Sequence, residues 1–575
     1  MRIHYTYTTS CFSSYFRTIL CCFLELYCLC APLHGQQNSC LFISPVRHEI
    51  ISSGSFGEPR SSHFHSGIDI KPYLGEGRDP LLAIGGGFIS RIRMSPVGYG
   101  KALYIDHPCG YTSVYAHMNS FNPIIQEYID KVRVATKLSE IDQYPPPFAL
   151  PIKQGEVLGY LGNSGNSFGA HLHFEIRNTA SETPINPVLF DIGPKDNVAP
   201  IIRGLLVYNL DHNRKVISQS YMSAIKKEGN NYVLNSSRIT SNWPLVGFGI
   251  HVYDQSNGAS NHNGIHYLDY LVNGERRFSF KIDSVSFEYS QYLHAHMDYG
   301  YKKNNKYVHK CFKDHGNPMS IYKMSRFGQI LIPNEVIADH ISIITADVFG
   351  NKSSLSFSIQ KDTSDFDDLS YKLLFPNVFP KDTSVLKSGA FTITFLPHTF
   401  LHPELITLDS LQRGIKILSE GPLLPMFREY KVESSLIQLQ IDHSDFEKMT
   451  FITKDSKGSN VNLGGQLSHT TIQTTTKEMG AIRLYKDATP PQISLVNNNR
   501  NTNITFRIWD NLKSSGKDTR MKYDGYADGR WVPMIYDKKN DLLSVQSKWI
   551  KGANEFKLKV SDFNKNISVR TLIVN

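Results

Sequence analysis

The sequence has few cysteines, and most of them lie in its first thirty residues. Of eight cysteines in 575 residues, five stand at positions 11, 21, 22, 28 and 30. The other three, Cys40, Cys109 and Cys311, are widely separated, and none belongs to a C-x-x-C pair. This spacing argues against a disulfide framework and against a structural zinc cluster built from thiolates.

A long uninterrupted apolar run is also missing. The most apolar stretch, "TILCCFLELYCLCAPLHG", is short, contains Glu25 and ends at the small residue Gly35. Basic residues precede it, which is typical of a secretory signal and not of a membrane span. We therefore predict a signal at residues 1–35, no membrane span in the mature chain, and export to the periplasm or cell envelope. Lipid attachment at Cys40 stays open, although "QNSC" has no apolar residue three positions before the cysteine.

Charge of one sign is not concentrated anywhere along the chain. Lysine and arginine number 61 and aspartate and glutamate 52, which gives a formal net charge of +9. This mildly basic balance suits ordinary solubility or contact with an anionic polymer. Because no basic cluster is interleaved with aromatic residues, we expect no nucleic-acid partner.

Short apolar segments and glycine turns recur about every ten residues between 41 and 192. "PLLAIGGGFISRIR", "YGKALYIDHP" and "GEVLGYLGNSG" show this pattern, which indicates a compact all-β domain. The segment "FNPIIQEYIDKVRVATKLSEIDQYPPPFALP" interrupts it. Near-helical spacing of its apolar residues predicts a short helix around 124–132, followed by an irregular loop.

A faint internal repeat runs through residues 193–575. One unit opens "DNVAPIIRGLLVYN" and closes "ITADVFGNKSSLSFSI"; another opens "DATPPQISLVNN" and closes "LKVSDFNKNISVRTLIV". Between these marks, "VYDQSNG" and "IWDNLKSSG" are also alike. Turn-forming Asp, Asn and Gly at fixed places indicate β-sandwich modules, with a third β-rich region between the two units.

A chain of this length requires several domains. We predict a mainly β protein in five parts, with the following boundaries: a secretory signal at 1–35, an all-β domain at 36–192, a β-sandwich module with insertions at 193–361, a β-rich middle module at 362–486, and a C-terminal Ig-like β-sandwich at 487–575.

Two histidines alternate with apolar residues in "GAHLHFEIR". On a strand, His171 and His173 share one face, and the intervening Leu172, Phe174 and Ile176 form a stripe for the core. Two imidazoles on one face can reach a single metal ion or a ligand beside it. The alternative is a pair of surface histidines on a half-exposed strand.

The stretch "HFHSGIDIK" offers a matching half-site. If it is extended, His65 and Asp69 share a face across Gly67, whose missing side chain leaves room for a metal. His63 points the same way but lies nearer the end of the strand. Together, His65, Asp69 and His173 form an incomplete tetrahedral zinc set whose fourth position is kept for water. Zinc lowers the pKa of that water and polarises a carbonyl.

Two further histidines could handle protons. His171 lies two residues from a candidate ligand on the same face, where it could act as a base or as an oxyanion partner. His117 in "SVYAHM" is a second candidate. The alternative for His117 is a structural histidine that ends a strand.

Together, "HFHSGIDI", "SVYAHM" and "GNSGNSFGAHLHFEIR" resemble, in order, the signature segments of lysostaphin-type (LytM-like) zinc metallopeptidases. The resemblance covers about residues 50–190. It implies a barrel-sandwich hybrid domain with an open groove, and hydrolysis of peptide bonds in bacterial peptidoglycan. Phe168 departs from the family by standing where a small hydroxyl residue is usual. The implied site is Zn²⁺ held by His65, Asp69 and His173, with His117 and His171 as the catalytic pair.

We therefore expect an exported zinc endopeptidase that cuts peptidoglycan cross-link peptides by zinc-activated water, positioned by its C-terminal modules. His171 would accept the water proton and His117 would bind the oxyanion, although these roles could be exchanged. One alternative is a non-catalytic cell-wall-binding or hydrolase-activating protein on the same fold. Another is an adhesive or scaffold protein. Protein partners are left unassigned.

A rival cluster occurs in "YLHAHMDYG", where His294, His296 and Asp298 stand at alternate positions. On a strand, these side chains could approach one metal. However, neighbouring side chains on one strand rarely converge tetrahedrally without a second element, and the polar surroundings indicate a solvated insertion. We also expect "GNSGNSFGAH" to form a tight turn near the groove, because it lacks the lysine of a P-loop and precedes a strand.

Overall fold

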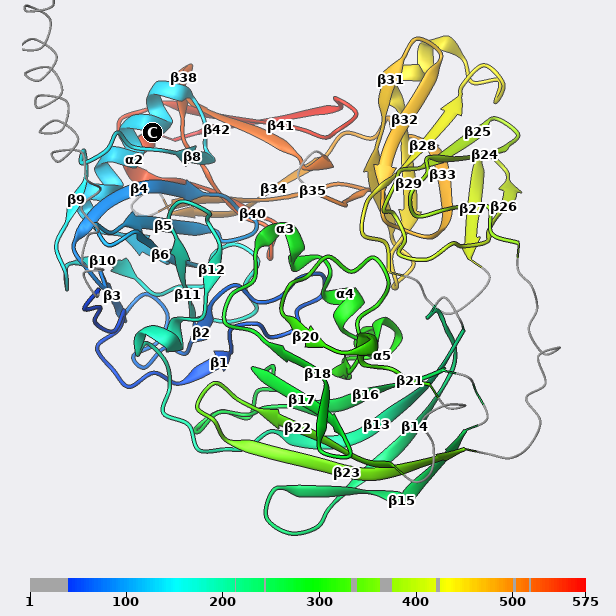
Figure 1. The fold of residues 1–575 in the computed structure, drawn as a ribbon. Coiled ribbons are helices and arrows are strands. Elements are labelled where there is room, and N and C mark those ends of the chain that lie inside the picture. The colour runs from blue at the N-terminus through cyan, green and yellow to red at the C-terminus, as the bar shows by residue number, and fades with distance from the viewer. Residues whose placement is uncertain are drawn as a thin grey trace, which may run out of the picture. The chain divides into compact units, whose positions relative to one another are not determined.

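The computed structural model describes residues 40–574, apart from the gaps 212–213, 242, 244, 332–338, 362–374, 420–424, 500–502 and 517–518 (Figure 1). The predicted secretory signal lies outside the described residues. Contacts divide the chain into Met1–Phe42 and Ile43–Asn575, and all the sheets belong to the second unit. Among the helices of the described part, none is long and apolar enough to cross a membrane.

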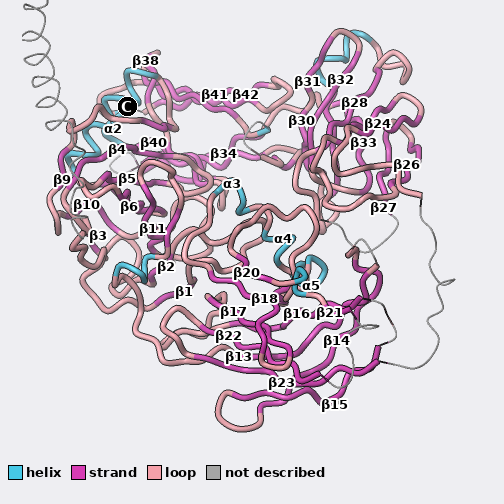
Figure 2. The backbone as a smooth tube through the Cα atoms, in the orientation of Figure 1, coloured by secondary structure: helices cyan, strands magenta, loops and turns pink. Residues whose placement is uncertain are grey.

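The expected mainly β architecture is confirmed: strands and loops make up most of the described residues, in which helices are few and mostly short (Figure 2). Near the N-terminus, a nine-stranded sheet has the order β1-β2-β11-β6-β5-β4-β8, with β12 paired to β11 and β9 to β4. A three-stranded sheet, β3-β10-β7, accompanies it. The strands of the larger sheet are β1 (Ser52–Gly54), β2 (Ile68–Ile70), β4 (Gly87–Met94), β5 (Lys101–Asp106), β6 (Tyr111–Ala116), β8 (Ile141–Gln143), β9 (Pro151–Ile152), β11 (Leu172–Asn178) and β12 (Pro184–Ile185). Those of the smaller sheet are β3 (Pro80–Leu82), β7 (Ser120–Phe121) and β10 (Val157–Tyr160).

Strand β11 is central to the N-terminal sheet. Leu172, Phe174 and Ile176 are completely buried, as the alternation predicted. The strand pairs antiparallel with β2 on one side and β6 on the other, and His173 lies opposite both Asp69 and Ala116. This register places the ends of three neighbouring strands around one point.

The predicted helix after His117 is confirmed as α2 (Pro123–Thr136). The Asn122 side chain caps it by accepting a hydrogen bond from the Ile125 amide (2.9 Å), and Pro123 occupies the first turn, where no amide partner is needed. Its buried face consists of Ile125, Ile129 and Arg133. Arg133 donates a hydrogen bond of 2.6 Å to the backbone carbonyl of Met534, far along the chain.

The first repeat unit forms an eleven-stranded sheet of order β19-β16-β13-β14-β15-β23-β22-β17-β18-β20, with β21 paired to β16. Its strands are β13 (Ile201–Leu210), β14 (Val216–Lys226), β15 (Asn231–Ser241), β16 (Leu245–Tyr253), β17 (Tyr267–Val272), β18 (Glu275–Lys281), β19 (Val308–Lys310), β20 (Tyr322–Met324), β21 (Ile330–Leu331), β22 (Asp339–Ala346) and β23 (Lys352–Lys361). Short helices occur at η1 (Pro187–Phe190), α3 (Phe287–Ser290), α4 (Leu293–His296), α5 (Tyr299–Lys303) and η2 (Arg326–Gly328).

The middle region and the C-terminal repeat unit each have a hydrophobic core of their own. The middle region contains a five-stranded and a six-stranded sheet, and the C-terminal unit contains two four-stranded sheets. The sixth strand of the six-stranded sheet, β36 (Lys513–Ser514), comes from the C-terminal unit. The middle strands are β24 (Ser384–Ser388), β25 (Phe391–Phe395), β26 (Ile406–Leu411), β27 (Gly414–Ser419), β28 (Tyr430–Ser435), β29 (Met449–Lys454), β30 (Asn460–Gly464), β31 (Gln466–Ser468), β32 (Thr471–Thr476) and β33 (Gly480–Lys486), with the helix η4 (His443–Lys448). The C-terminal elements are β34 (Gln492–Asn499), β35 (Asn503–Trp509), β36 (Lys513–Ser514), β37 (Lys522–Ala527), β38 (Arg530–Val532), β39 (Ile535–Asp537), β40 (Leu542–Gln546), α7 (Ser547–Ile550), β41 (Glu555–Ser561) and β42 (Ile567–Ile573). The domain boundaries given above stay predictions.

Two expectations from the sequence are wrong. The segment with His294, His296 and Asp298 is not a solvated strand: it forms α4 and caps α5, and His296 is buried at 1% exposure. In addition, Cys40 and Cys109 are disulfide-bonded, whereas Cys311 is a free buried thiol. Alternate spacing alone does not distinguish short helices from a strand. The two cysteines are far apart in the sequence, so no local pattern indicates that they form a disulfide.

Candidate metal centre

Three neighbouring strands carry the predicted site residues. Asp69 lies on β2 and His173 on β11, directly opposite each other. His65 precedes β2, and His117 follows β6 at a left-handed backbone position (φ 59°). His171 stands just before β11. The sheet therefore brings all five residues to one place, although they are up to 108 positions apart.

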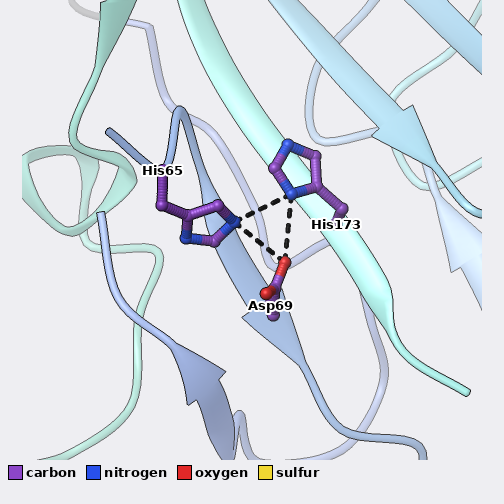
Figure 3. A group of neighbouring side chains, drawn as sticks. All are labelled: His65, Asp69 and His173. Carbon is purple, nitrogen blue, oxygen red and sulfur yellow. Dashed lines mark hydrogen bonds and ion pairs between the residues drawn. The ribbon is translucent and has the colours of Figure 1, made fainter. Parts of the chain in front are cut away.

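His65, Asp69 and His173 present three ligand atoms to one another (Figure 3). The distances from His65 Nε2 to His173 Nδ1, from His65 Nε2 to Asp69 Oδ1, and from His173 Nδ1 to Asp69 Oδ1 are all 3.0 Å. All three residues are buried. Tetrahedral ligands about 2.0–2.1 Å from one zinc ion lie about 3.3 Å apart, so the observed spacing is close to that of a zinc site.

The hydrogen bonds on the far sides of the two rings decide which nitrogens face the centre. His65 Nδ1 lies 2.8 Å from the Ser55 carbonyl and must donate to it, which leaves a lone pair on Nε2. His173 Nε2 donates to Glu175 Oε1 at 2.8 Å, so that Nδ1 is the nitrogen that faces the centre. His65 Nε2, His173 Nδ1 and Asp69 Oδ1 therefore converge. Without a metal, His173 Nδ1 can donate to Asp69 Oδ1 (3.0 Å): burial lowers the pKa of His173, but its hydrogen bonds to Asp69 and Glu175 raise that pKa to about 9. With a metal bound, both nitrogens would present lone pairs to it. The donor set fits Zn²⁺.

Glu175, which the sequence analysis did not name, contacts the candidate ligand His173. It is completely buried, and its other oxygen accepts a hydrogen bond of 2.6 Å from Arg177 Nε. The hydroxyls of Ser66 and Tyr99 also donate to it. The guanidinium of Arg177 offsets the cost of burial and holds the pKa of Glu175 well below its usual range. The signal was present in the strand alternation, because Glu175 shares a face with His173.

Arg60 is a second residue that sequence spacing did not indicate. Its Nη2 donates to Asp69 Oδ2 at 2.6 Å, while Asp69 Oδ1 faces the two histidines. Burial alone would raise the pKa of Asp69, but its contacts with His65 and His173 bring that pKa well below its ordinary value. The carboxylate is therefore ionised and oriented, as a metal ligand must be.

The proposed catalytic pair, His117 and His171, lies beside this centre. Their ring centroids are 4.8 Å apart, and His171 Nε2 is 3.5 Å from Asp69 Oδ1. His117 Nδ1 donates to the Ser164 carbonyl and His171 Nδ1 to the Gly169 carbonyl, each at 2.8 Å. Both rings consequently offer a free Nε2 lone pair. Burial lowers the pKa of both, that of His117 to about 3, so both are neutral at pH 7.

His63, Ser164 and Phe168 lie outside the group of converging ligands. His63 is exposed. Ser164 is a positioning residue, because its carbonyl accepts from His117 and its hydroxyl donates to the Met118 carbonyl. Phe168 is fully exposed.

The prediction that Gly67 leaves room for a metal is wrong. A Cβ at this position would lie 2.2 Å from the Phe174 carbonyl oxygen. Gly67 therefore allows the segment before β2 to approach the backbone of β11, and it does not clear space for a metal.

The comparisons with known proteins match the N-terminal region of the chain. The model of Peptidase family M23 matches residues 63–143, a span that contains His65, Asp69 and His117 and ends before His171. The DD-carboxypeptidase/endopeptidase Mpg of Neisseria meningitidis serogroup B is 30% identical over 124 residues, which are 22% of this chain and 22% of that protein. The cell division protein DipM of Caulobacter vibrioides is 26% identical over 152 residues, 26% of this chain and 20% of that protein. The chain thus spans well under two thirds of these relatives.

Solved structures with a similar region include the catalytic domain of lysostaphin from Staphylococcus simulans. It is 22% identical, with 24% of this chain and 91% of that chain covered and a TM-score of 0.18. A zinc containing peptidase from Vibrio cholerae is 21% identical, with 26% and 39% covered and a TM-score of 0.19. The family match and the curated relatives confirm that the N-terminal region resembles LytM-like M23 peptidases.

Proposed function

We propose that the protein is an exported zinc-dependent endopeptidase that hydrolyses peptide bonds in bacterial peptidoglycan. The observation that carries this proposal is the convergence of ligand atoms from His65, Asp69 and His173 beside the histidine pair His117 and His171. The relative named a DD-carboxypeptidase/endopeptidase supports cleavage of peptide bonds. The peptidoglycan substrate follows from the resemblance to lysostaphin-type enzymes.

The residues of the chain divide the work as follows. His65, Asp69 and His173 would hold Zn²⁺, which when bound lowers the pKa of a water towards about 7 and polarises a carbonyl. The Nε2 lone pair of His171 or His117 accepts the proton of the attacking water. Once protonated, that nitrogen can return the proton to the leaving amine. The second histidine stabilises the oxyanion when it carries a proton on Nε2. The shared Nδ1–H tautomer suits either ring to the role of base, whereas the oxyanion role requires that the second ring carry a proton on Nε2 as well.

Two features support export. The first is the predicted signal at residues 1–35. The second is that Cys40 and Cys109 are disulfide-bonded, because disulfides persist mainly in oxidising compartments such as the periplasm and the cell surface.

Polar contacts join residues of the C-terminal repeat unit to residues of the N-terminal region. Lys548 pairs with Asp130 on α2 (2.5 Å), and Arg520 pairs with Glu140 (3.0 Å). Lys539 Nζ donates to Asn163 Oδ1 at 2.8 Å, one residue from the Ser164 carbonyl that orients His117. These contacts support a role for the C-terminal module in shaping access to the candidate active site.

The experiment is direct. The purified chain is loaded with zinc and incubated with isolated peptidoglycan, and new amino groups are counted. We expect release by the wild type and none by Asp69→Ala. A chain that binds one zinc ion and still releases no amino groups would favour the non-catalytic, wall-binding alternative.

A further inference from the structure

Each of the two repeat units gathers three aspartates. In the first unit they are Asp196, Asp254 and Asp347; in the second they are Asp487, Asp510 and Asp562. In each group, one carboxylate oxygen from every aspartate lies within 4.8 Å of the others. One aspartate precedes the first strand of the unit, and the other two directly follow strand ends: β16 and β22 in the first unit, β35 and β41 in the second.

The two groups are built alike, atom by atom. Asn351 donates from its backbone amide to Asp347 Oδ1 (2.8 Å) and from Nδ2 to Asp347 Oδ2 (2.7 Å). Asn566 makes the same two bonds to Asp562, at 2.8 and 2.7 Å. The same Nδ2 groups also donate to the backbone carbonyls of the first aspartates, Asp196 (3.3 Å) and Asp487 (3.1 Å). The sequence repeat is therefore a repeated three-dimensional arrangement.

Equivalent oxygens in the two groups have no hydrogen-bond donor. These atoms are Asp196 Oδ2 and Asp254 Oδ1 in the first group, and Asp487 Oδ2 and Asp510 Oδ1 in the second. Asp254 is only 4% exposed and Asp487 only 1%. A buried carboxylate oxygen without a partner is costly, so the same vacancy at equivalent atoms in two units points to a ligand.

Protein cations offset little of this charge, although Lys448, from beyond salt-bridge distance, partly opposes the rise that burial causes in the pKa of Asp562. Within the described part of the chain, none of the six aspartates forms a salt bridge with a Lys, Arg or His. Burial, and then the neighbouring carboxylates, raise the pKa of Asp254 to about 8 and that of Asp510 to about 7. Each unit also holds a buried asparagine whose side-chain oxygen lacks a donor: Asn263, which is hydrogen-bonded to the backbone of Asp254, and Asn564, between Asp562 and Asn566.

We propose that each aspartate group binds one Ca²⁺ ion, so that the chain carries two calcium sites separate from the peptidase centre. The donors are all oxygens, which suits a hard cation and not zinc. Two oxygens bound to one Ca²⁺ at about 2.4 Å can lie at most ~4.8 Å apart, the spacing that each group satisfies. Mg²⁺ requires near-ideal octahedral geometry and keeps its waters, which suits a buried group of protein oxygens less well. A bound ion would tie the segment before the first strand to two strand ends.

The test is equilibrium dialysis of the full, zinc-loaded chain against CaCl₂, together with thermal unfolding with and without calcium. We expect two ions per chain, with dissociation constants of ~1 mM or tighter, as for extracellular calcium modules. Asp254→Asn and Asp510→Asn should each remove one ion, and the double variant should remove both. Asp409→Asn changes an exposed aspartate of the middle region and should retain two ions.

Folding of the variants is checked in the same experiment. Because asparagine is uncharged and close in size to the aspartate it replaces, the calcium-free melting temperature of the variants should be unchanged or higher, and only the rise caused by calcium should disappear. No calcium bound at about 10 mM, unchanged stoichiometry in both variants, or equal affinity for Mg²⁺ would each overturn the proposal.

Discussion

The peptidase centre and the aspartate groups are both buried sites where three ligand atoms converge, but they differ in their donors and in their partners. The centre at His65, Asp69 and His173 combines two nitrogens with one oxygen, and each ligand is held from behind by Ser55, Glu175 or Arg60. The aspartate groups offer only oxygens, and two of these oxygens in each group have no partner. The first arrangement, with its oriented histidine rings, would suit a borderline-soft ion. The second would suit a hard ion.

Their positions differ as well. In the peptidase centre, Asp69 and His173 lie opposite each other on paired strands, and His65 lies in the segment that leads into β2. The aspartate groups lie at strand ends, where an ion can join segments that are far apart in sequence. We infer that the proposed zinc ion would take part in catalysis, whereas the proposed calcium ions would stabilise the arrangement of strands within the repeat units.

The largest effect should come from Asp69→Ala, which separates the two kinds of site. Removing this ligand should abolish tight zinc binding and lower peptidoglycan hydrolysis by at least ~1,000-fold, since a catalytic metal contributes several kcal/mol to the transition state. Calcium uptake should stay at its wild-type value. Metal analysis after dialysis and an amino-group assay measure both. Retention of zinc would mean that Asp69 is not a ligand.

His117→Ala and His171→Ala should separate catalysis from metal binding within the peptidase centre. Each should reduce hydrolysis by ~10²–10⁴-fold, the usual contribution of a general acid or base, with zinc content unchanged. His63→Ala is the matched control, because His63 belongs to the same sequence stretch as His65 but is exposed, and it should keep full activity. Equal activity in all three variants would remove the histidine pair from the mechanism.

Glu175→Gln tests whether the partners behind the ligands distinguish the peptidase centre. The amide keeps the size of the side chain but weakens its hold on the Nε2–H of His173. Zinc affinity should fall by ~10–100-fold in competition with a chromogenic chelator. Saturating zinc should restore most of the activity. If affinity does not change, the tautomer of His173 is fixed by something other than Glu175.

The smallest effect concerns a third buried cluster, His296 and His309, whose nitrogens lie 2.9 Å apart with no carboxylate between them. Burial lowers the pKa of His296 from 6.5 to about 3. Between these pH values, His296 is protonated in the unfolded chain but not in the folded chain. The free energy of unfolding therefore falls as pH decreases from 6.5 towards 3, by up to ~1.4 kcal/mol per pH unit for one proton.

His296→Gln should therefore reduce the loss of melting temperature between about pH 7 and about pH 5, measured by calorimetry. It should leave the zinc content at one ion, because this pair lacks the carboxylate that completes the peptidase centre. An unchanged pH dependence would show that His296 is not the group that titrates on unfolding.

Local patterns in the sequence were enough to predict a large part of the fold. The alternation in "GAHLHFEIR" predicted the buried stripe of β11, and the helical spacing after His117 predicted α2. The same kind of pattern failed for His294, His296 and Asp298, because alternate spacing was interpreted as a strand where the chain forms short helices. Short polar segments carry too little periodicity to decide between the two.

The aspartate groups show what a repeat can and cannot reveal. The sequence showed that "VYDQSNG" resembles "IWDNLKSSG" and that both units end in Asp-x-x-x-Asn, and turn formation explained each motif separately. It gave no sign that Asp254 meets Asp347 or that Asp510 meets Asp562. Those contacts depend on which strands are neighbours, which residue spacing does not encode.

The sequence by itself determined the types of residue available for chemistry and the strand faces on which they stand. Tertiary structure decided which of them meet. Strand pairing across about a hundred residues placed His65 and Asp69 against His173, brought Arg60 and Glu175 behind them, and gave Gly67 a packing role. The physical reason is that side-chain alternation is a local property of the backbone, whereas a metal site needs atoms from separate strands within a few ångströms.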